Sequence, residues 1–141
     1  MRPADSELAR MTQKIWIPLF TPPPPPTYIP KEEFAKTMGD AFNQRFKDVA
    51  AAVQKLHARG GKIVFVRFPN SGDLKKLEDR ETPRVGIWDR VLKDTSAPGI
   101  YYEDFRDLAG FSCPEWSHLS AGDSVEFSKR LIPHLRAALG M

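Results

Sequence analysis

The sequence predicts an α/β fold, of a partial flavodoxin-like type in which two or three parallel strands are flanked by helices in three layers. A long stretch with apolar residues at helical spacing, residues 31–56, ends at a double glycine and leads into the apolar run 63–66. The same order, a helical pattern and then a short apolar run, recurs between residues 82 and 102. A helix that leads through a short turn into a strand is half of a parallel βαβ unit, so two such pairs predict parallel strands.

The first 29 residues are predicted to form an N-terminal arm, separate from an α/β domain at residues 30–141. Residues 1–13 are polar and predict a loose arm or a short helix, and the apolar run 15–20 predicts a third strand cut short by Pro18. Residues 21–27 contain five consecutive prolines, which fix φ and donate no N–H group. Such a run can dock to SH3, WW or profilin-like domains, but between two folded pieces it favours a stiff polyproline II connector.

The first helix of the domain is predicted to begin at Pro30 and to end at Gly60 and Gly61, because glycine is typical of the position after a helix. The run 63–66 is apolar at every position, as in a strand that is covered on both faces. The helix has apolar residues three or four positions apart, which places them on one face. This stripe consists of Phe34, Met38, Phe42, Phe46, Val49, Val53 and Leu56.

The second half of the chain predicts three more helical segments and one more strand. Residues 73–80 indicate a polar helical turn, and a helix is predicted to start at Thr82. A strand at 100–102 follows, and a short helical piece leads from it to the loop before the last helix. That last helix is predicted to begin near Ser120, and Pro133 should kink it or weaken one of its turns.

The composition is that of a globular protein of one domain and excludes several classes of function. The chain has 141 residues and a net charge of +3, with basic and acidic residues interspersed, so we expect no nucleic-acid binding. One cysteine and three scattered histidines predict neither a disulfide nor a metal site, and we expect no cofactor. No apolar run approaches the ~20 residues of a membrane span, and the N-terminus lacks the apolar core of a signal peptide. As written the chain is expected to be cytoplasmic without membrane insertion, although the compartment of a longer gene product stays open.

Three loops follow predicted strands or lead into the last helix, and sites in parallel sheets form beyond the carboxyl ends of the strands. The first holds Arg67, Asn70 and Ser71, the second is Glu103-Asp104, and the third spans residues 111–119. We expect ligand contacts from the first loop. Arg67 could instead pair with the acidic residues of the second, and Asn70 and Ser71 are also common turn formers.

The third loop contains Glu115, two further residues, and then His118-Leu119-Ser120, with a glycine before the last helix. This segment resembles the last motif of the SGNH/GDSL hydrolases, usually Asp-x-x-His, and the resemblance extends over residues 31–139 through the order of helices and strands. It implies that His118 is the general base of a serine esterase or acyltransferase and that Glu115 orients its imidazole. It also implies acyl esters as substrates, carbohydrate esters among them.

The Gly-Asp-Ser segment that carries the nucleophile in that family is not recognisable near the N-terminus. Two serines are the remaining candidates, Ser6 and Ser124. Gly122-Asp123-Ser124 has the family's letters after the histidine rather than before it, and Ser120 with Asp123 is better interpreted as a capping box. Ser6 follows no apolar strand and is more typical of a helix cap. The nucleophile is therefore not identified.

So small a parallel sheet would leave an unpaired edge and uncovered apolar faces. We therefore expect the fold to be completed by a second copy or a complementary chain, through the sheet edge or the long helix. An alternative function follows from the missing nucleophile: a catalytically inactive SGNH-like remnant that serves as a binding or assembly module. Trp88 and Trp116 are expected to pack in the core or a lid, and Cys113 to be an unreactive thiol.

Overall fold

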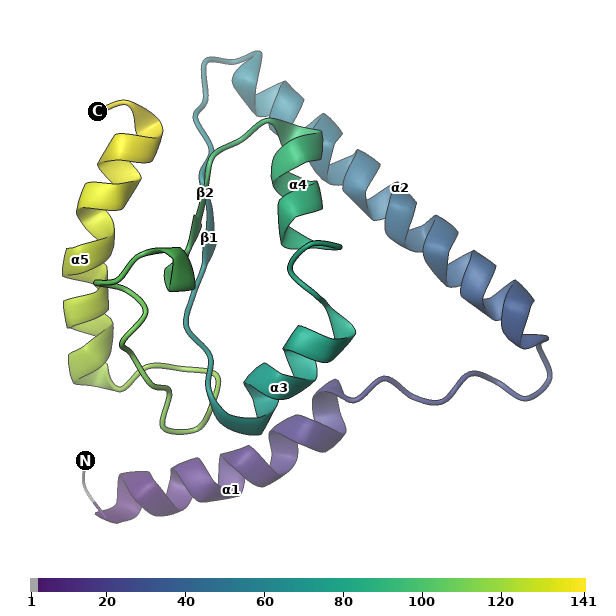
Figure 1. Ribbon diagram of the computed structural model, residues 1–141, viewed down its shortest axis with the longest axis horizontal. Coiled ribbons are helices and arrows are strands. Elements are labelled where there is room, and N and C mark those ends of the chain that lie inside the picture. The colour runs from purple at the N-terminus through teal and green to yellow at the C-terminus, as the bar shows by residue number, and fades with distance from the viewer. Residues whose placement is uncertain (1–2) are drawn as a thin grey trace.

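The computed structural model describes residues 3–141 and shows a mostly helical α/β protein with a small parallel sheet (Figure 1). The α/β class and the parallel strands are confirmed. Within the described residues there are five α-helices and two strands. In chain order these are α1 (Pro3–Phe20), α2 (Lys31–His57), β1 (Phe65–Arg67), α3 (Gly72–Glu81), α4 (Trp88–Thr95), β2 (Gly99–Tyr101), the 3-10 turn η1 (Tyr102–Asp104) and α5 (Ala121–Leu139).

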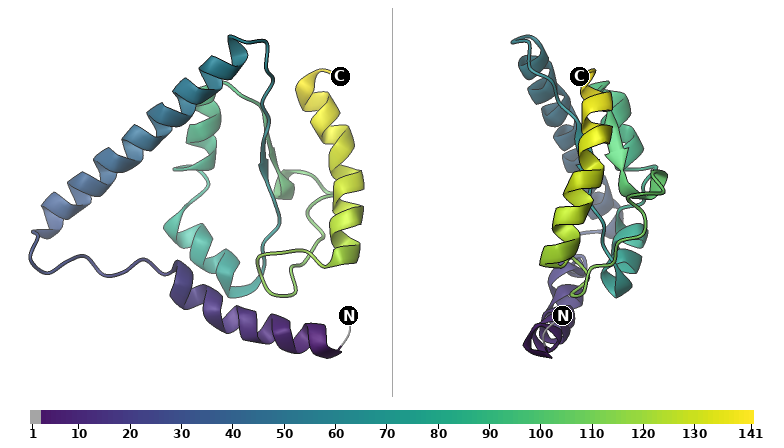
Figure 2. Two further views of the ribbon diagram at one scale, coloured as in Figure 1. Left: turned by 180° about the vertical axis from the view of Figure 1, so that it is seen from behind. Right: turned by 90° about the vertical axis from the view of Figure 1, so that its left-hand side faces the viewer.

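The two strands pair in parallel over three residues each, with Val66 opposite Ile100. Both lie within two residues of the predicted runs. Helix α5 lies on one side of the strands, and α4 with α2 lies on the other, as the views from behind and from the side also show (Figure 2). Gly99 allows this close packing, because a Cβ atom there would lie 2.7 Å from Leu92 and 2.8 Å from Trp88 of α4.

The core lies between the sheet and α5 and holds most of the fully buried side chains. Ile100 of β2 and Phe127 of α5 are each 2% exposed, and Leu108 in the turn after η1 is 0% exposed. The ring of Phe127 lies 5.4 Å from that of Phe111 and 5.7 Å from that of Phe68. These contacts hold the segments on both sides of the predicted site against α5.

The N-terminal segment differs from the prediction, because residues 15–20 are not a strand. They form the last turns of α1, in which Pro18 is included. A proline this near the end of a helix removes only one hydrogen bond, and the chain still closes a turn with Thr21 N–H donating to the carbonyl of Ile17 at 2.9 Å. Residues 21–30, with the proline run, form neither helix nor strand.

Helix α2 has the predicted extent, but its apolar stripe is only partly covered. Phe46 and Val53 are buried, whereas Met38, Phe42, Val49 and Leu56 are exposed. Helix α4 packs against the C-terminal half of α2, and the N-terminal half projects away from the sheet (Figure 1). This helix therefore presents an apolar face to solvent.

The helices predicted for the second half of the chain are present with shifted boundaries. Residues 72–81 form a full helix, α3, and the helix expected from Thr82 begins only at Trp88 because residues 83–87 form a turn. The capping box is present, since Ser120 Oγ accepts from Asp123 N–H at 3.1 Å. Helix α5 continues through Pro133. Every helix within residues 3–141 is too short or too polar to span a bilayer.

A substitution in the core tests this packing. We expect Leu108→Ala to lower the free energy of unfolding by ~2–5 kcal/mol, because it leaves a cavity at a site with no exposure. Val125→Ala on the exposed face of α5 is the matched control, with an expected change within ~0.5 kcal/mol. Urea unfolding followed by circular dichroism measures both, and equal losses would contradict the placement of Leu108.

Candidate active site

The loop that carries His118 is bound to the turn that follows β1. Ser71 N–H donates to the carbonyl of Trp116 at 2.9 Å, and Ser71 Oγ accepts from Cys113 N–H at 2.8 Å. Cys113 Sγ lies 3.3 Å from the carbonyl of Pro69. The histidine loop therefore lies where β1 has ended, which is the edge at which sites form in parallel sheets.

The histidine loop crosses over the turn that follows β1, and the small size of Gly72 makes this crossing possible because the Trp116 ring lies against it. Gly72 has a φ of +60°, and a Cβ atom there would lie 2.2 Å from Nε1 of Trp116. Trp116 itself adopts a left-handed φ of +78°, which is unfavourable for a residue of its size. The indole ring occupies the space that only a glycine leaves free, so Trp116 packs against the start of α3 as a structural residue.

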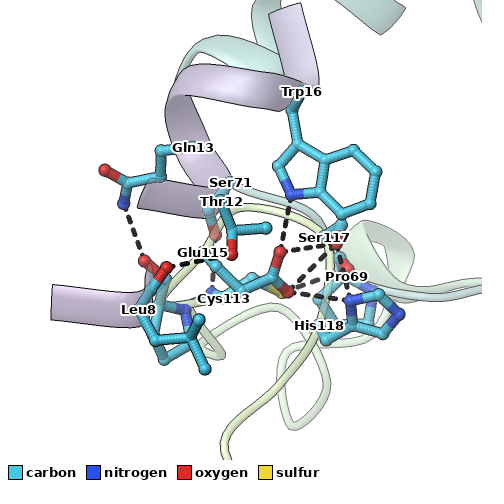
Figure 3. A network of polar contacts seen from close by, with 11 residues as sticks. Leu8, Thr12, Gln13, Trp16, Pro69, Ser71, Cys113, Glu115, Ser117 and His118 are labelled. Carbon is cyan, nitrogen blue, oxygen red and sulfur yellow. Dashed lines mark hydrogen bonds and ion pairs between the residues drawn. The ribbon is translucent and has the colours of Figure 1, made fainter. Parts of the chain in front are cut away.

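His118 and Glu115 form the pair that the motif predicts. Oε1 of Glu115 lies 2.8 Å from Nδ1 of His118 (Figure 3). The histidine side chain is 77% exposed and the carboxylate 18%. Within residues 7–141 no hydrogen bond reaches Nε2 of His118. An ionised carboxylate on Nδ1 favours the tautomer with its proton on that nitrogen, which leaves a lone pair on Nε2 for a proton donor.

Two further side chains that the sequence did not predict complete the surroundings of Glu115. Ser117 Oγ donates to the carboxylate at 2.8–3.0 Å and lies 2.6 Å from Nδ1 of His118. Trp16 Nε1 of α1 donates to Oε2 at 2.6 Å. Ser117 shares the nitrogen that faces the acid, so its hydroxyl is not placed as the nucleophile of a triad. Its position between the two paired residues could have drawn attention to it, whereas no sequence signal links Trp16 to this loop.

These hydrogen-bond donors lower the pKa of Glu115. Burial raises the pKa of Glu115, but the hydrogen bonds from Trp16, Ser117 and His118 outweigh burial and hold the pKa below its ordinary value of 4.5. Because the folded-state pKa is depressed, the carboxylate stabilises the fold at higher pH. That stabilisation is lost as the pH falls below 4.5 and through the folded-state pKa.

Two pockets meet at His118. One has a volume of about 360 Å³ and lies between α1 and the loop, with Thr12, Pro114 and Glu115 in its wall. The other, of about 240 Å³, is lined by Phe68 and Phe127 together with three serines, Ser117, Ser124 and Ser128. His118 and Leu119 line both. A substrate could therefore approach the imidazole from either side of the ring.

The two serine candidates lie on different elements. Ser124 lines the smaller pocket, but its hydroxyl donates to the carbonyl of Ala121 at 2.8 Å within the first turn of α5. Ser6 lies in α1 and is partly buried. The Ser124 hydroxyl is thus engaged within its own helix, and the nucleophile stays unidentified.

The predicted ligand-binding residues of the first loop lie inside a polar network. Arg67 forms an ion pair with Glu78 of α3 rather than with Glu103 or Asp104, the alternative partners that the sequence offered. Asn70 is 8% exposed, and its Nδ2 donates to the same Glu78 carboxylate at 2.6 Å. The reason is that α3 folds back over the strand end. Glu103 and Asp104 instead bond to Lys75 at 3.2 Å and Arg84 at 2.7 Å, respectively.

The other chemical groups of the loop are structural in this arrangement. Cys113 is 2% exposed, and burial raises the pKa of its thiol, which makes the reactive thiolate less available. No group of three or more metal-binding side chains gathers within residues 3–141.

No protein-family model, no curated protein and no solved structure matches the chain.

The contact between the Trp116 ring and Gly72 provides a test of how the histidine loop crosses the turn after β1. We expect Gly72→Ala to lower the free energy of unfolding by about 2 kcal/mol or more, because Ala is strained at this φ and its Cβ meets the Trp116 ring. Gly122→Ala is the control, since nothing lies within 4 Å of its added Cβ, and its change should stay within ~1 kcal/mol. Thermal and urea unfolding measure both variants, and a Gly72→Ala protein as stable as wild type would contradict the crossing.

Proposed function

We propose that this chain is part of an SGNH-type ester hydrolase or acyltransferase, in which His118 is the general base and Glu115 is the acid that orients it. The observation that carries the proposal is the geometry of the pair. The carboxylate contacts Nδ1, the side chain is exposed and lines two pockets, and no hydrogen bond within residues 7–141 reaches Nε2. This is the division of roles that a serine triad requires of its histidine.

In this reaction Nε2 removes the proton from a serine hydroxyl while the serine oxygen attacks the carbonyl carbon of an acyl ester. The proton then passes from the imidazolium to the leaving alcohol, and an acyl-serine remains. Water or a second alcohol, activated by the same nitrogen, releases the acyl group and regenerates the serine. Glu115 keeps the proton of Nδ1 in place and stabilises the imidazolium. The proposed substrates are acyl esters, including esters of carbohydrates.

The nucleophile would come from outside the segment around His118. Ser6 and Ser124 are the candidates on this chain, and a second copy or a complementary chain is the other source. Arg67, Asn70 and Ser71 are the proposed substrate contacts, although the first two must then release Glu78 or share it with the ligand.

We further propose that the two strands belong to a flavodoxin-like three-layer sheet that another chain completes. Strands of three residues pair only with each other here, so each has an outer edge. The exposed stripe of α2 supports the same proposal, because a projecting helix gains most of its stability from tertiary packing.

A second candidate function is a catalytically inactive SGNH-like module for binding or assembly. The specific observation in its favour is that the hydroxyl of Ser124, the serine candidate in the smaller pocket, donates to the carbonyl of Ala121 within α5, while the base and acid are both in place. Retention of the pair without a nucleophile would then reflect a role in loop structure.

An assay of ester hydrolysis distinguishes the active hydrolase from the inactive binding module. We expect the purified chain to hydrolyse short p-nitrophenyl esters, and His118→Ala to reduce the rate by ~10²–10⁴, the usual contribution of a general base. Glu115→Gln should reduce it by a smaller factor, because the base is kept but poorly oriented. His134→Ala is the matched control, since His134 also pairs with a carboxylate, that of Asp107 at 2.9 Å, far along α5.

A fluorophosphonate probe followed by peptide mapping would identify the reactive serine in the active protein. If wild type and His118→Ala give the same background rate, and no serine is labelled, this chain alone is not a catalyst. The inactive binding module, or a nucleophile supplied by a complementary chain, then remains.

Association through α2 is tested by molar mass. We expect light scattering after size exclusion to give a mass above the 16.0 kDa of one chain, falling on dilution. Phe42→Glu should shift the protein to the monomer, because it places a charge in the exposed stripe, whereas Ala51→Glu at another exposed site on α2 should not. A stable monomer at every concentration would contradict association between copies.

A further inference from the structure

The carboxylate of Glu115 receives one of its hydrogen bonds from a helix that is remote in the sequence. Trp16 belongs to α1, lies 99 residues before Glu115 along the chain, and donates its indole N–H at 2.6 Å (Figure 3). The proline-containing segment 21–30 separates α1 from the rest of the protein. Only the docking of α1 therefore brings this donor to the loop.

The two carboxylate oxygens share one donor and differ in their other partner. Ser117 Oγ donates to both, at 3.0 and 2.8 Å, whereas Oε1 alone lies 2.8 Å from Nδ1 of His118 and Oε2 alone accepts from Trp16. The terminal torsion of a glutamate is soft, and the Ser117 hydroxyl lies on the same short loop as the carboxylate. The indole N–H adds an anchor from a different element, and it does so without competing for the oxygen that contacts the imidazole.

Trp16 is itself held in position by α1. Gln13, one turn earlier on the same face, donates from Nε2 to the carbonyl of Pro114 at 2.7 Å. Ala9, one further turn back, is buried, and the ring of Phe20 stacks on Trp16 at 5.2 Å. The spacing 9, 13, 16 and 20 is that of one helix face, and Gln13 and Trp16 on this face contact the loop, while Phe20 supports the Trp16 ring from the end of the helix.

We infer that Trp16 is a positioning residue for the His118–Glu115 pair, and that α1 acts as a clamp that sets the orientation of the general base. This inference rests on the proposed function, because it assigns Trp16 a role in the same site. The indole ring lies 6.4 Å from the His118 ring, centroid to centroid, and its N–H donates to Glu115. Its effect is exerted through Glu115.

Loss of the indole N–H has two expected consequences. The pKa of Glu115 should rise, since a donor to the ionised form is removed. The neutral His118 ring should move from the Nδ1–H tautomer toward the Nε2–H tautomer that a free histidine favours, because Oε1 is held less firmly. The titratable groups near Glu115 are His118 and the buried thiol of Cys113, so other titrations interfere little.

The wild-type protein gives the first measurement, which needs no variant. We expect the indole N–H resonance of Trp16 to shift at the pH at which Glu115 is protonated, while the indole resonances of Trp88 and Trp116 do not follow that transition. Selective ¹³C labelling of glutamate side chains reports the titration of Glu115. If the Trp16 resonance does not shift as Glu115 titrates, the inference is overturned.

Trp16→Phe gives the second measurement, because it removes the N–H and keeps an aromatic ring. ¹⁵N shifts of His118 should show a lower fraction of the Nδ1–H tautomer than in wild type, and the pKa of Glu115 should be higher. Trp88→Phe, which alters a tryptophan that packs on Tyr101, should change neither. Gln13→Leu removes the other bond of α1 to the loop and should have a smaller effect than Trp16→Phe.

The outcomes separate this inference from the proposed function. If wild-type His118 is already an Nε2–H tautomer with no coupling to Glu115, the proposed base fails and the role of Trp16 fails with it. If wild type shows the Nδ1–H tautomer but Trp16→Phe leaves it unchanged, only the role of Trp16 is overturned. That role is also overturned if Gln13→Leu has as large an effect as Trp16→Phe, because general loosening of α1 then explains the change.

Discussion

The geometry of the candidate site depends on the crossing between the histidine loop and the turn after β1. Two of the hydrogen bonds that join these segments involve Ser71, one between backbone groups of Ser71 and Trp116 at 2.9 Å and one from Cys113 N–H to Ser71 Oγ at 2.8 Å. Both involve the backbone of the loop, so they fix its course as well as its side chains. His118 follows two residues after this anchor, and its ring therefore points outward at the end of the strand.

The environment of the carboxylate distinguishes this histidine from the others. His134 also has an acidic partner, but Asp107 contacts its Nε2, and the Asp107 side chain is 49% exposed. Glu115 contacts Nδ1 of His118 and is 18% exposed, with donors on both of its oxygens. A partly buried, fully bonded carboxylate orients its partner more firmly than an exposed one, because solvent competes less for its oxygens.

Outside the region around His118, the sheet is short and one helix face is uncovered. Each strand has three paired residues, and the exposed members of the α2 stripe include Met38 and Phe42. The core between the sheet and α5, by contrast, is well filled around Leu108 and Phe127. The proposed association would therefore stabilise α2 and the outer strand edges rather than the region that holds His118.

The sequence by itself determined the elements whose signal is local. The stripe of α2, the runs of β1 and β2 and the capping box at Ser120 were found because neighbouring residues specify them. The run 15–20 was misassigned because six apolar residues suit either a strand or the end of a helix. Only the tertiary structure decided that Trp16 contacts Glu115 and that Glu78 pairs with Arg67 and Asn70. These contacts depend on how α1 and α3 dock, and docking is set by the shape and burial of whole helix faces rather than by the residues adjacent in the chain.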